Sequence, residues 1–444
     1  MNNRIRNFSE TERLYRRALE TIPTASQTFS KSAINYVRGA SPLFAERGKG
    51  AELWDADGNR YVDYVMGLLP AVLGYADPDV DAAIRDQLAR GITLSLATEL
   101  EIVLAETLRR LIPCAEMARF GKNGTDATSA AIRIARAATG RDKVAVCGYH
   151  GWQDWYIGST TRDLGVPEAV RRLTLTFPYN DAAALERLLD ENRNEIAAII
   201  LEPMALTPPT PGFLASVRDL ATRYGSVLVF DEIVTGFRID LGGAQTVFGV
   251  TPDLASFGKA MGNGMPISAI VGRRELMRLM EDIFFSGTFS GETLSLAASL
   301  ATIRKLERLN GLQTISALGA DLIQEIGALL SSTDLDRSFM LVGGNWWPGL
   351  LPNPGSNHAP VLLTSLLRQE LIANGVLMGA TFNLSLAHAE PRILGETLAA
   401  FRAALGAVGE ALASADPWQY LRGEPIRPVF SVRATAPQSS SDRR

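Results

Sequence analysis

Residues 197–232 read AAIILEPMALTPPTPGFLASVRDLATRYGSVLVFDE, and this stretch decides the fold class. It begins and ends near short apolar runs, Ala197–Leu201 and Val227–Phe230, and between them Leu214–Tyr224 carries apolar residues at helical spacing. A strand, a helix and a second strand of these lengths form a crossover unit whose two strands lie parallel in one sheet. The stretch therefore predicts part of a parallel α/β sheet.

The same alternation continues on both sides of this stretch. Apolar runs at Val144–Cys147 and Ile267–Val271 predict two more strands, and Thr125–Ala138 and Ala182–Asn192 have helical spacing. Helices that alternate with buried strands cover both faces of a mostly parallel sheet. We therefore predict an α/β domain in which helices sandwich the sheet.

The two ends of the chain have a different pattern. Ala51–Val65 alternates around Asp57-Gly58-Asn59, which is a hairpin signal. After a long helical segment from Leu294 to about Leu309, Gly311 interrupts the pattern, and helices with short strands follow. Residues 343–360, rich in Gly, Pro and Asn, predict a loop. We expect an N-terminal segment at 1–69, a large domain at 70–310, a smaller α+β domain at 311–425 and a disordered tail at 426–444.

Composition narrows the function classes. The chain has 444 residues, of which 46 % are hydrophobic, and this is enough apolar material for two domains. Its net charge is −4, which gives no sign of a nucleic-acid or anionic-membrane partner. Two cysteines and three histidines argue against a disulfide scaffold and against a metal site. No apolar run reaches the ~18 residues of a membrane span, and the polar, Arg-rich start is unlike a secretory signal. We expect a cytoplasmic protein.

Two residues at predicted strand ends point to chemistry, because ligands of open α/β sheets bind beyond the carboxyl ends of the strands. Asp231 follows the Val227–Phe230 strand, where it is either a buried, directed carboxylate or an ordinary helix cap. Lys259, one of six lysines, lies in the glycine-rich segment 258–264. There it is either a desolvated amine with a lowered pKa, suited to nucleophilic catalysis, or a solvated loop residue.

Two further segments suit a phosphate and a planar ring. Residues 121–126, GKNGTD, precede a strong helix, and the first N–H groups of a helix bind phosphate well. Tyr149 follows the Val144–Cys147 strand and can stack on a planar group. Taken alone, residues 121–126 are equally typical of an ordinary Asn-Gly turn, and Tyr149 is equally typical of an aromatic residue that packs in the core. The chain has neither a P-loop nor a GxGxxG turn after a strand.

The four features together are the parts of a pyridoxal phosphate site. The lysine forms a Schiff base, the acid keeps the pyridine nitrogen protonated, the helix start binds the phosphate and the aromatic ring stacks on the pyridine. We therefore predict a pyridoxal phosphate enzyme.

Six motifs, in this order, resemble those of the class III pyridoxal-phosphate aminotransferases, nearest to the glutamate-1-semialdehyde aminomutase-like group. The resemblance covers about residues 20–410. Each motif alone is common, and the shared order carries the resemblance. The motifs are NGTDA (123–127), YHG (149–151), LEP (201–203), DEIVTGFR (231–238), PDLASFGK (252–259) and GTFSG (287–291).

The resemblance implies the fold-type I architecture of aspartate aminotransferase-like enzymes, with a small domain built from both termini. It also implies pyridoxal 5'-phosphate as cofactor and a homodimer whose shared active sites lie at the subunit interface. By position, Lys259 would form the Schiff base, known as the internal aldimine, and shuttle a proton between the substrate Cα and the cofactor C4′. Asp231 would pair with the pyridine N1.

The resemblance also implies roles for other residues. Gly124 and Thr125 would bind the phosphate, and Tyr149 would stack on the ring. Thr288 would reach the phosphate of the neighbouring subunit's cofactor. Glu202 would join the polar network near the ring and the lysine.

These features predict an aminotransferase with small-molecule partners. It would move an amino group from a donor such as L-glutamate, through pyridoxamine phosphate, to an aldehyde or ketone acceptor. Where the aminomutase has a carboxylate-binding arginine, this chain has TFSK (28–31), whose Lys31 lacks the bidentate fork of arginine. A modified sugar or specialised metabolite is therefore the expected kind of acceptor. The alternatives are an aminomutase, an epimerase and a non-catalytic member of the fold, and the presence of Lys259 and Asp231 argues against the last.

Overall fold

The computed structural model describes residues 6–427. Residues 1–5 and 428–444 lie outside the described part, and with them most of the predicted tail at 426–444. The described chain forms two compact units: unit 1 comprises residues 6–82 and 304–427, and unit 2 comprises residues 83–303. The sequence placed the corresponding divisions at 69 and 310. The divisions between the units fall inside two helices, α2 (Pro78–Leu88) and α11 (Thr293–Arg308).

Unit 2 is built on a seven-stranded sheet. In spatial order its strands are β4 (Met117–Gly121), β10 (Ser268–Gly272), β9 (Leu254–Phe257), β8 (Val227–Asp231), β7 (Ile196–Leu201), β5 (Lys143–Cys147) and β6 (Thr174–Thr176). β10 runs antiparallel to β4 and β9, and the other neighbouring pairs are parallel. The predicted mostly parallel sheet is confirmed.

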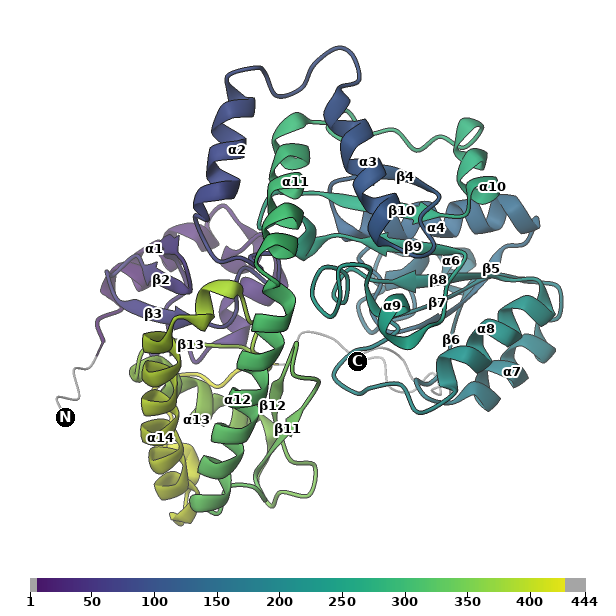
Figure 1. The fold of residues 1–444 in the computed structure, drawn as a ribbon. Coiled ribbons are helices and arrows are strands. Elements are labelled where there is room, and N and C mark those ends of the chain that lie inside the picture. Colours follow the sequence, from purple (N-terminus) through teal and green to yellow (C-terminus); the bar gives the residue numbers. More distant parts are fainter. Residues whose placement is uncertain (1–5, 428–444) are drawn as a thin grey trace. The chain divides into compact units, whose positions relative to one another are not determined.

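Helices cover the sheet of unit 2. They are α3 (Glu99–Leu111), α4 (Gly124–Thr139), α5 (Asp154–Ile157), α6 (Glu168–Arg171), α7 (Ala182–Glu191), α8 (Phe213–Tyr224), α9 (Ala244–Phe248) and α10 (Arg274–Met277), with the 3-10 helices η4 (Lys259–Gly262) and η5 (Arg278–Glu281). α4 contacts β7, β8, β9 and β10, whereas α8 contacts α7 and β8 (Figure 1).

The interior of unit 2 shows why these strands form. All six residues of β7 are buried, as expected for a parallel strand with helices on both faces. On the α4 face, Val146, Ile200 and Val229 from three strands belong to one core cluster with Ala131 and Ile134 of the helix. The small and branched residues of α4 let this helix lie close to the sheet, which fixes where its first turn stands.

Unit 1 combines segments from both ends of the chain. Its larger sheet has the order β1 (Ala45–Lys49), β2 (Glu52–Asp55), β3 (Arg60–Asp63), β13 (Val376–Leu377), and a second sheet pairs β11 (Phe339–Val342) with β12 (Gly349–Pro352). Its helices are α1 (Ser9–Leu19), α12 (Gly311–Ser332), α13 (Pro360–Ala373) and α14 (Pro391–Ala413), with the 3-10 helices η1 (Pro23–Ala25), η2 (Phe29–Lys31), η3 (Ala33–Asn35), η6 (Leu386–Ala389) and η7 (Pro417–Tyr420).

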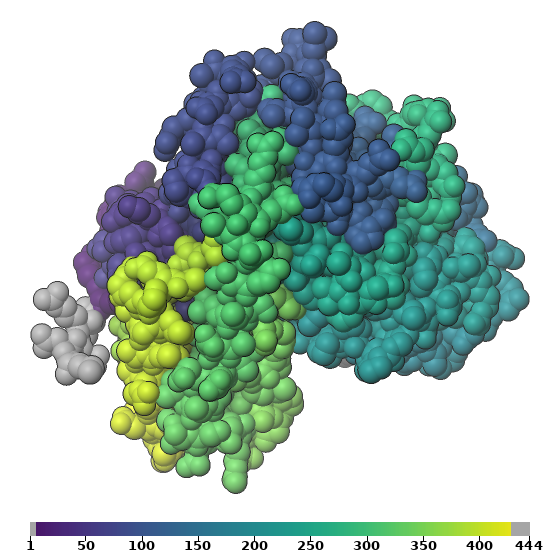
Figure 2. Space-filling model, viewed as in Figure 1, coloured from purple at the N-terminus to yellow at the C-terminus, as the bar shows by residue number. Residues whose placement is uncertain are grey.

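The pairing in unit 1 confirms one prediction and corrects another. β2 and β3 are antiparallel, as the hairpin signal predicted. The predicted loop at 343–360 is wrong in part, because residues 349–352 form β12 against β11. The single proline of this strand is its last residue, where a sheet tolerates proline. α12 and α14 lie side by side, and their side chains form a continuous surface (Figures 1 and 2).

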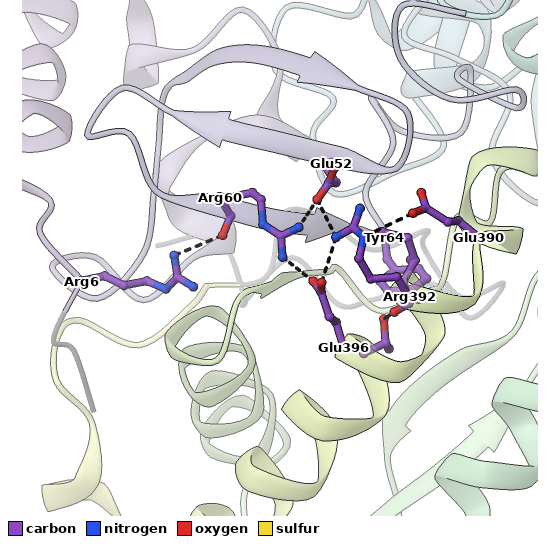
Figure 3. A network of polar contacts seen from close by, with 9 residues as sticks. Arg6, Glu52, Arg60, Tyr64, Glu390, Arg392 and Glu396 are labelled. Atoms are coloured by element: carbon purple, nitrogen blue, oxygen red, sulfur yellow. Dashed lines mark hydrogen bonds and ion pairs between the residues drawn. The ribbon is translucent and has the colours of Figure 1, made fainter. Parts of the chain in front are cut away.

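A network of ion pairs ties the first segment of unit 1 to α14 (Figure 3). Arg60 of β3 pairs with Glu52 and Glu396. Arg392 Nη1 lies 2.8 Å from Glu396 Oε1 and 3.2 Å from Glu52 Oε1, and its Nε lies 3.2 Å from Glu390 Oε1. Each exposed pair contributes little, but the network leaves both arginines surrounded by carboxylates.

Residues 6–427 have neither a membrane-spanning helix nor a metal-binding cluster of side chains. No helix in this part of the chain is long and apolar enough to cross a membrane. The same residues include no group of three or more His, Cys, Asp or Glu side chains arranged to hold a metal ion.

Candidate active site

Five residues singled out in the sequence stand at the ends of five parallel strands of unit 2. Gly124 comes after β4, Tyr149 after β5, Glu202 after β7, Asp231 ends β8 and Lys259 comes after β9. The five strands share one direction because β10, which separates β4 from β9, is antiparallel to both. Their carboxyl ends therefore lie along one edge of the sheet, where ligands of open α/β folds bind.

Asp231 and His150 form a buried pair at this edge. Side chains alternate along a strand, so Asp231 shares the face of β8 on which Val227 and Val229 pack against α4. Asp231 Oδ2 lies 2.8 Å from His150 Nδ1, and Asp231 Oδ1 accepts a hydrogen bond from the Ile233 N–H at 3.1 Å. Both side chains are buried, so the hydrogen bond between them is shielded from water.

The surroundings of His150 determine where its protons lie. Nε2 is 3.1 Å from the carbonyl oxygen of Cys147, which can only accept, so Nε2 carries a proton. An ionised Asp231 carboxylate also only accepts, so it requires a proton on Nδ1 as well. With Nδ1 as the donor, His150 holds the Asp231 carboxylate in a charge-assisted hydrogen bond.

Lys259 combines a strained backbone with a buried amine. Its φ is +41°, a region that a residue with a Cβ adopts at a cost and that is found most often at functional sites. Burial lowers the pKa of its amine, Glu202 and Asp231 oppose this as negative charges, and Arg238 adds to the lowering. A lowered pKa increases the fraction of neutral amine, which is the nucleophilic and basic form.

Glu202 supplies a second carboxyl group near the lysine. Its Oε2 accepts a hydrogen bond from the Tyr149 N–H at 2.9 Å. Burial raises the pKa of Glu202 and the charge of Asp231 raises it further, while His150 and Lys259 act in the opposite direction. Glu202 is therefore a group that holds a proton beside the lysine amine more readily than an exposed glutamate does.

The first turn of α4 provides an anion site. Asn123 caps the helix, and the Asp126 carboxylate accepts the Asn123 N–H at 2.8 Å in a capping box. Gly124 and Thr125 follow, and the first N–H groups of a helix have no partner within it. The Thr125 hydroxyl is buried without a hydrogen-bond partner among the described residues. A Cβ at Gly151 would clash with this hydroxyl, so the glycine keeps the space beside it open.

Tyr149 follows β5 at the same edge of the sheet. The residue is 46 % exposed, which is unusual for a tyrosine that merely packs. Its ring stands edge-on to the Tyr156 ring at a centroid distance of 5.6 Å, and the Tyr156 hydroxyl donates to the Gly148 carbonyl at 2.7 Å. Tyr156 thus supports the Tyr149 ring, and an aromatic ring of this exposure is suited to stacking on a planar group.

Thr288 stands in a different setting from the other predicted residues. It lines an open depression of about 1040 Å3 in unit 2, together with α3 residues such as Glu101 and Arg109. None of the five strand-end residues lines this depression. The structure of the single chain therefore does not bring Thr288 together with them.

Sequence reasoning missed several residues of this site. The sequence pattern assigns no role to His150, although the YHG motif (149–151) contains it, and the function of Gly151 is visible only from its closeness to Thr125. Arg238 is fully buried, and its charge contributes to lowering the pKa of Lys259. The DEIVTGFR motif (231–238) was the available signal for Arg238.

The comparison with protein families agrees with this geometry. The model of the class-III aminotransferases matches residues 35–337. The chain belongs to the class-III aminotransferase family. It is therefore a pyridoxal-phosphate-dependent aminotransferase-family enzyme, and the predicted fold-type I architecture and cofactor are confirmed.

Curated relatives in this class-III family carry two kinds of activity in their names. The chain is 40 % identical over 322 residues to a 3-aminobutyryl-CoA aminotransferase of Cloacimonas acidaminovorans, covering 71 % of this chain and 77 % of the relative. It is 39 % identical over 402 residues to a glutamate-1-semialdehyde 2,1-aminomutase of Roseiflexus castenholzii, covering 84 % of this chain and 92 % of the relative.

A solved structure of the class-III fold is also similar. The FumI protein of Sphingopyxis sp. MTA144, solved with pyridoxal phosphate, superposes with a TM-score of 0.84 at 29 % identity, covering 93 % of this chain and 99 % of that one. The residues of this chain fit the cofactor. A buried amine, a buried carboxylate and an unpartnered buried hydroxyl at a helix start match its aldehyde, its ring nitrogen and its phosphate.

Proposed function

We propose that this enzyme transfers an amino group from a donor amino acid such as L-glutamate to an aldehyde or ketone of a second molecule. The observation that carries the proposal is the buried Lys259 amine, which shares a sheet edge with the Asp231–His150 pair. When bound, pyridoxal phosphate supplies an aldehyde and an electron-withdrawing ring, which make the substrate Cα acidic. A modified sugar or specialised metabolite remains the proposed kind of acceptor.

Lys259 is proposed to hold the cofactor and to move the proton. Its Nζ, when neutral, would accept a proton from the substrate Cα and would hold it for return to C4′ of the cofactor. Burial lowers the pKa of this amine, which increases its neutral fraction at a given pH. Glu202, with its raised pKa, is proposed to hold a proton close to this amine and the ring.

Asp231 is proposed to hold a proton on the pyridine nitrogen. A carboxylate can do this only while it is ionised, and a hydrogen bond from His150 Nδ1 favours that form. Gly124 and Thr125 are proposed to bind the phosphate through the first N–H groups of α4 and the Thr125 hydroxyl. Tyr149 is proposed to stack on the ring.

An aminomutase is the second candidate, because one relative at 39 % identity is named as an aminomutase. Such an enzyme moves the amine within one molecule. The position near Lys31 speaks for the transaminase, since a lysine there binds a carboxylate as a point charge and lacks the fork of an arginine. A pyridoxal-phosphate epimerase is the remaining alternative.

We further propose a homodimer in the cytoplasm, with Thr288 completing the partner's site. Large apolar side chains are exposed on or beside the depression that Thr288 lines, which is unusual for a protein that stays a monomer. They are Leu94, Leu96, Ile102, Phe284 and Phe289. Their burial against a second copy would bring Thr288 to a neighbouring cofactor.

The test is an absorbance spectrum of the purified holoenzyme before and after addition of L-glutamate. A transaminase converts its bound cofactor, so the visible band disappears and 2-oxoglutarate is released in an amount equal to the enzyme. Alanine and simple amines are the next donors to test. If no donor changes the spectrum, while glutamate-1-semialdehyde turns over without any added keto acid, the enzyme is an aminomutase and the transaminase proposal fails.

A further inference from the structure

One ion pair of unit 2 joins two segments that lie 170 residues apart in the sequence. The Lys122 ammonium lies 2.7 Å from Glu292 Oε1. Lys122 directly precedes the Asn123 cap of α4, and Glu292 directly precedes α11. The pair therefore links the start of the helix that is proposed to bind the phosphate to the start of a second helix.

The two charges of this pair are largely shielded from water. The Lys122 side chain is 18 % exposed and the Glu292 side chain is 10 % exposed. Burial raises the pKa of Glu292, but hydrogen bonds from Lys122 and Ser295 outweigh it, and the pKa lies below the ordinary value. Glu292 is therefore ionised near neutral pH, and salt screens its attraction to the ammonium less than it screens an exposed pair.

The Glu292 carboxylate is also fixed by the backbone of α11. Its Oε2 accepts the Leu294 N–H at 2.9 Å, and its Oε1 accepts the Ser295 N–H at 3.1 Å. These N–H groups belong to the first turn of the helix, where they have no partner within it. The Glu292 N–H donates to the Phe289 carbonyl at 3.2 Å. A carboxylate held in this way gives the Lys122 side chain a fixed point.

The backbone of Lys122 is part of the turn that leads into α4. The N–H groups of Lys122 and Asn123 both donate to Asp126 Oδ2, at 2.9 and 2.8 Å. Asp126 thus holds this turn from within α4, and the Lys122 side chain holds it from outside, through Glu292. The next two residues of the chain are the proposed phosphate ligands, so the position of their N–H groups depends on this turn.

Two possible roles of the Lys122 ammonium lead to opposite expectations for Glu292. If the ammonium attracts the phosphate directly, Glu292 partly neutralises it, and removal of Glu292 strengthens phosphate binding. If the ammonium holds the turn, it needs Glu292, and removal of either residue weakens phosphate binding. The 2.7 Å contact between the two side chains and the fixed position of the carboxylate favour the second role.

We propose that Lys122 and Glu292 are positioning residues for the cofactor: their ion pair fixes the turn before α4, so that the first N–H groups of the helix are in place for the phosphate. In this role neither side chain touches the cofactor. The proposal rests on the phosphate site proposed above, and it adds what holds that site in position.

The test is a titration of the full-length apoenzyme with pyridoxal phosphate and with pyridoxal, followed by absorbance. Pyridoxal has the ring and the aldehyde of the cofactor but lacks the phosphate. We expect Lys122→Met and Glu292→Gln each to bind pyridoxal phosphate about 10-fold more weakly, and to change the affinity for pyridoxal by less than ~2-fold. Lys122→Arg keeps the cation and should bind pyridoxal phosphate within ~3-fold of the wild type.

The double variant Lys122→Met/Glu292→Gln shows whether the two residues act as one unit. In that case it loses no more affinity for pyridoxal phosphate than either single variant. Stronger binding of pyridoxal phosphate by Glu292→Gln would reveal a direct attraction by Lys122 and overturn the proposal. Unchanged binding by Glu292→Gln, or an equal loss of affinity for pyridoxal, also overturns it. If Lys122→Met does not fold, the direction of the change in Glu292→Gln decides.

Lys143→Met is the matched control. Lys143 begins β5, at the opposite edge of the sheet from the strand-end residues, and its ammonium lies 2.6 Å from Glu195 Oε2. Its loss should leave the affinity for pyridoxal phosphate unchanged, and circular dichroism should show that every variant is folded.

Gly151→Ala separates a failure of this proposal from a failure of the phosphate site. A Cβ at Gly151 would clash with the Thr125 hydroxyl, so this variant disturbs the site itself. If Gly151→Ala weakens binding of pyridoxal phosphate and the ion-pair variants do not, only the role of the ion pair is wrong. If all of these variants bind as the wild type does, the phosphate lies elsewhere and both proposals fail.

Discussion

His150 acts on Asp231 through a single buried hydrogen bond of 2.8 Å. His150→Gln keeps a polar side chain but loses the ring nitrogen that hydrogen-bonds the Asp231 carboxylate. A hydrogen bond to a charged group contributes about 1.5–3 kcal/mol, so we expect roughly 10- to 100-fold weaker cofactor binding. Equilibrium dialysis with pyridoxal phosphate measures this. His358→Gln, in a loop of unit 1, is the control, and equal affinities in both variants would contradict the assigned role of His150.

In the apoenzyme, the buried Lys259 amine should lower the free energy of unfolding. Its pKa is lowered in the folded state, so the unfolded chain binds the proton more tightly, and folding is penalised at every pH below the ordinary value of ~10.4. Each unit of lowering costs about 1.4 kcal/mol. We expect the Lys259→Met apoenzyme to have a higher Tm than the wild-type apoenzyme near neutral pH, with the difference shrinking as pH rises toward that value.

The activity of the same variant should change in the opposite direction. Lys259→Met holoprotein should lose turnover by about 100- to 10,000-fold, the range supplied by general acid–base catalysis. Differential scanning fluorimetry and a donor assay on one preparation give both numbers. If the Lys259→Met apoenzyme has a lower Tm than the wild-type apoenzyme, the buried amine does not destabilise the fold, contrary to our prediction.

For single residues, the sequence could predict which of them lie at strand ends, but it could not predict their hydrogen bonds. Asp231 and Lys259 could be found because an acid after an apolar run and a lysine among glycines are visible in the printed chain. The partner of Asp231 could not, because His150 is 81 residues away and only the parallel pairing of the strands brings it near.

The α4 N-terminus is the element on which phosphate binding depends. Gly151→Ala places a Cβ against the Thr125 hydroxyl, at a φ of +108° that alanine adopts poorly. We expect the affinity for pyridoxal phosphate to fall by at least ~10-fold, because charge-assisted hydrogen bonds to the phosphate are worth about 1.5–3 kcal/mol. Fluorescence titration of the apoenzyme measures it.

The other end of the same helix supplies a control. Gly140 caps α4 with a φ of +66°, and a Cβ there would meet nothing within 4 Å. Gly140→Ala should therefore lower stability by about 1 kcal/mol and leave cofactor affinity unchanged. If both alanine variants bind the cofactor equally, the space beside Thr125 is not where the phosphate lies.

Among the elements, those with long apolar runs could be predicted from the sequence, and short or interrupted ones could not. β7 and β8 match their predicted positions within one residue, because a buried parallel strand is apolar throughout. β12 lies inside a glycine- and proline-rich segment and becomes a strand only through its pairing with β11. This pairing depends on residues that are distant in the sequence, and the pattern of a few neighbouring residues does not include them.

For the whole molecule, the exposed apolar side chains predict association. Leu96, which is 84 % exposed, lines the depression around Thr288. Leu96→Arg should shift the protein toward monomer and reduce turnover with it, if a second copy covers this surface. Leu164→Arg, at an even more exposed leucine that does not line the depression, should leave both unchanged. Sedimentation velocity gives the oligomeric state, and a wild-type monomer with full activity contradicts the dimer.

The parallel pair of β3 with β13 also has a consequence for synthesis on the ribosome. Val62 pairs with Val376, roughly 300 residues later, so the N-terminal part of unit 1 cannot complete its sheet until nearly the entire chain has been made. At ~5–20 residues per second this is a wait of about 15–60 s. Unit 2 is a continuous segment and can fold in that interval. The nascent N-terminal hairpin therefore passes through the tunnel first and reaches its final pairing last, which makes it the segment most in need of a chaperone.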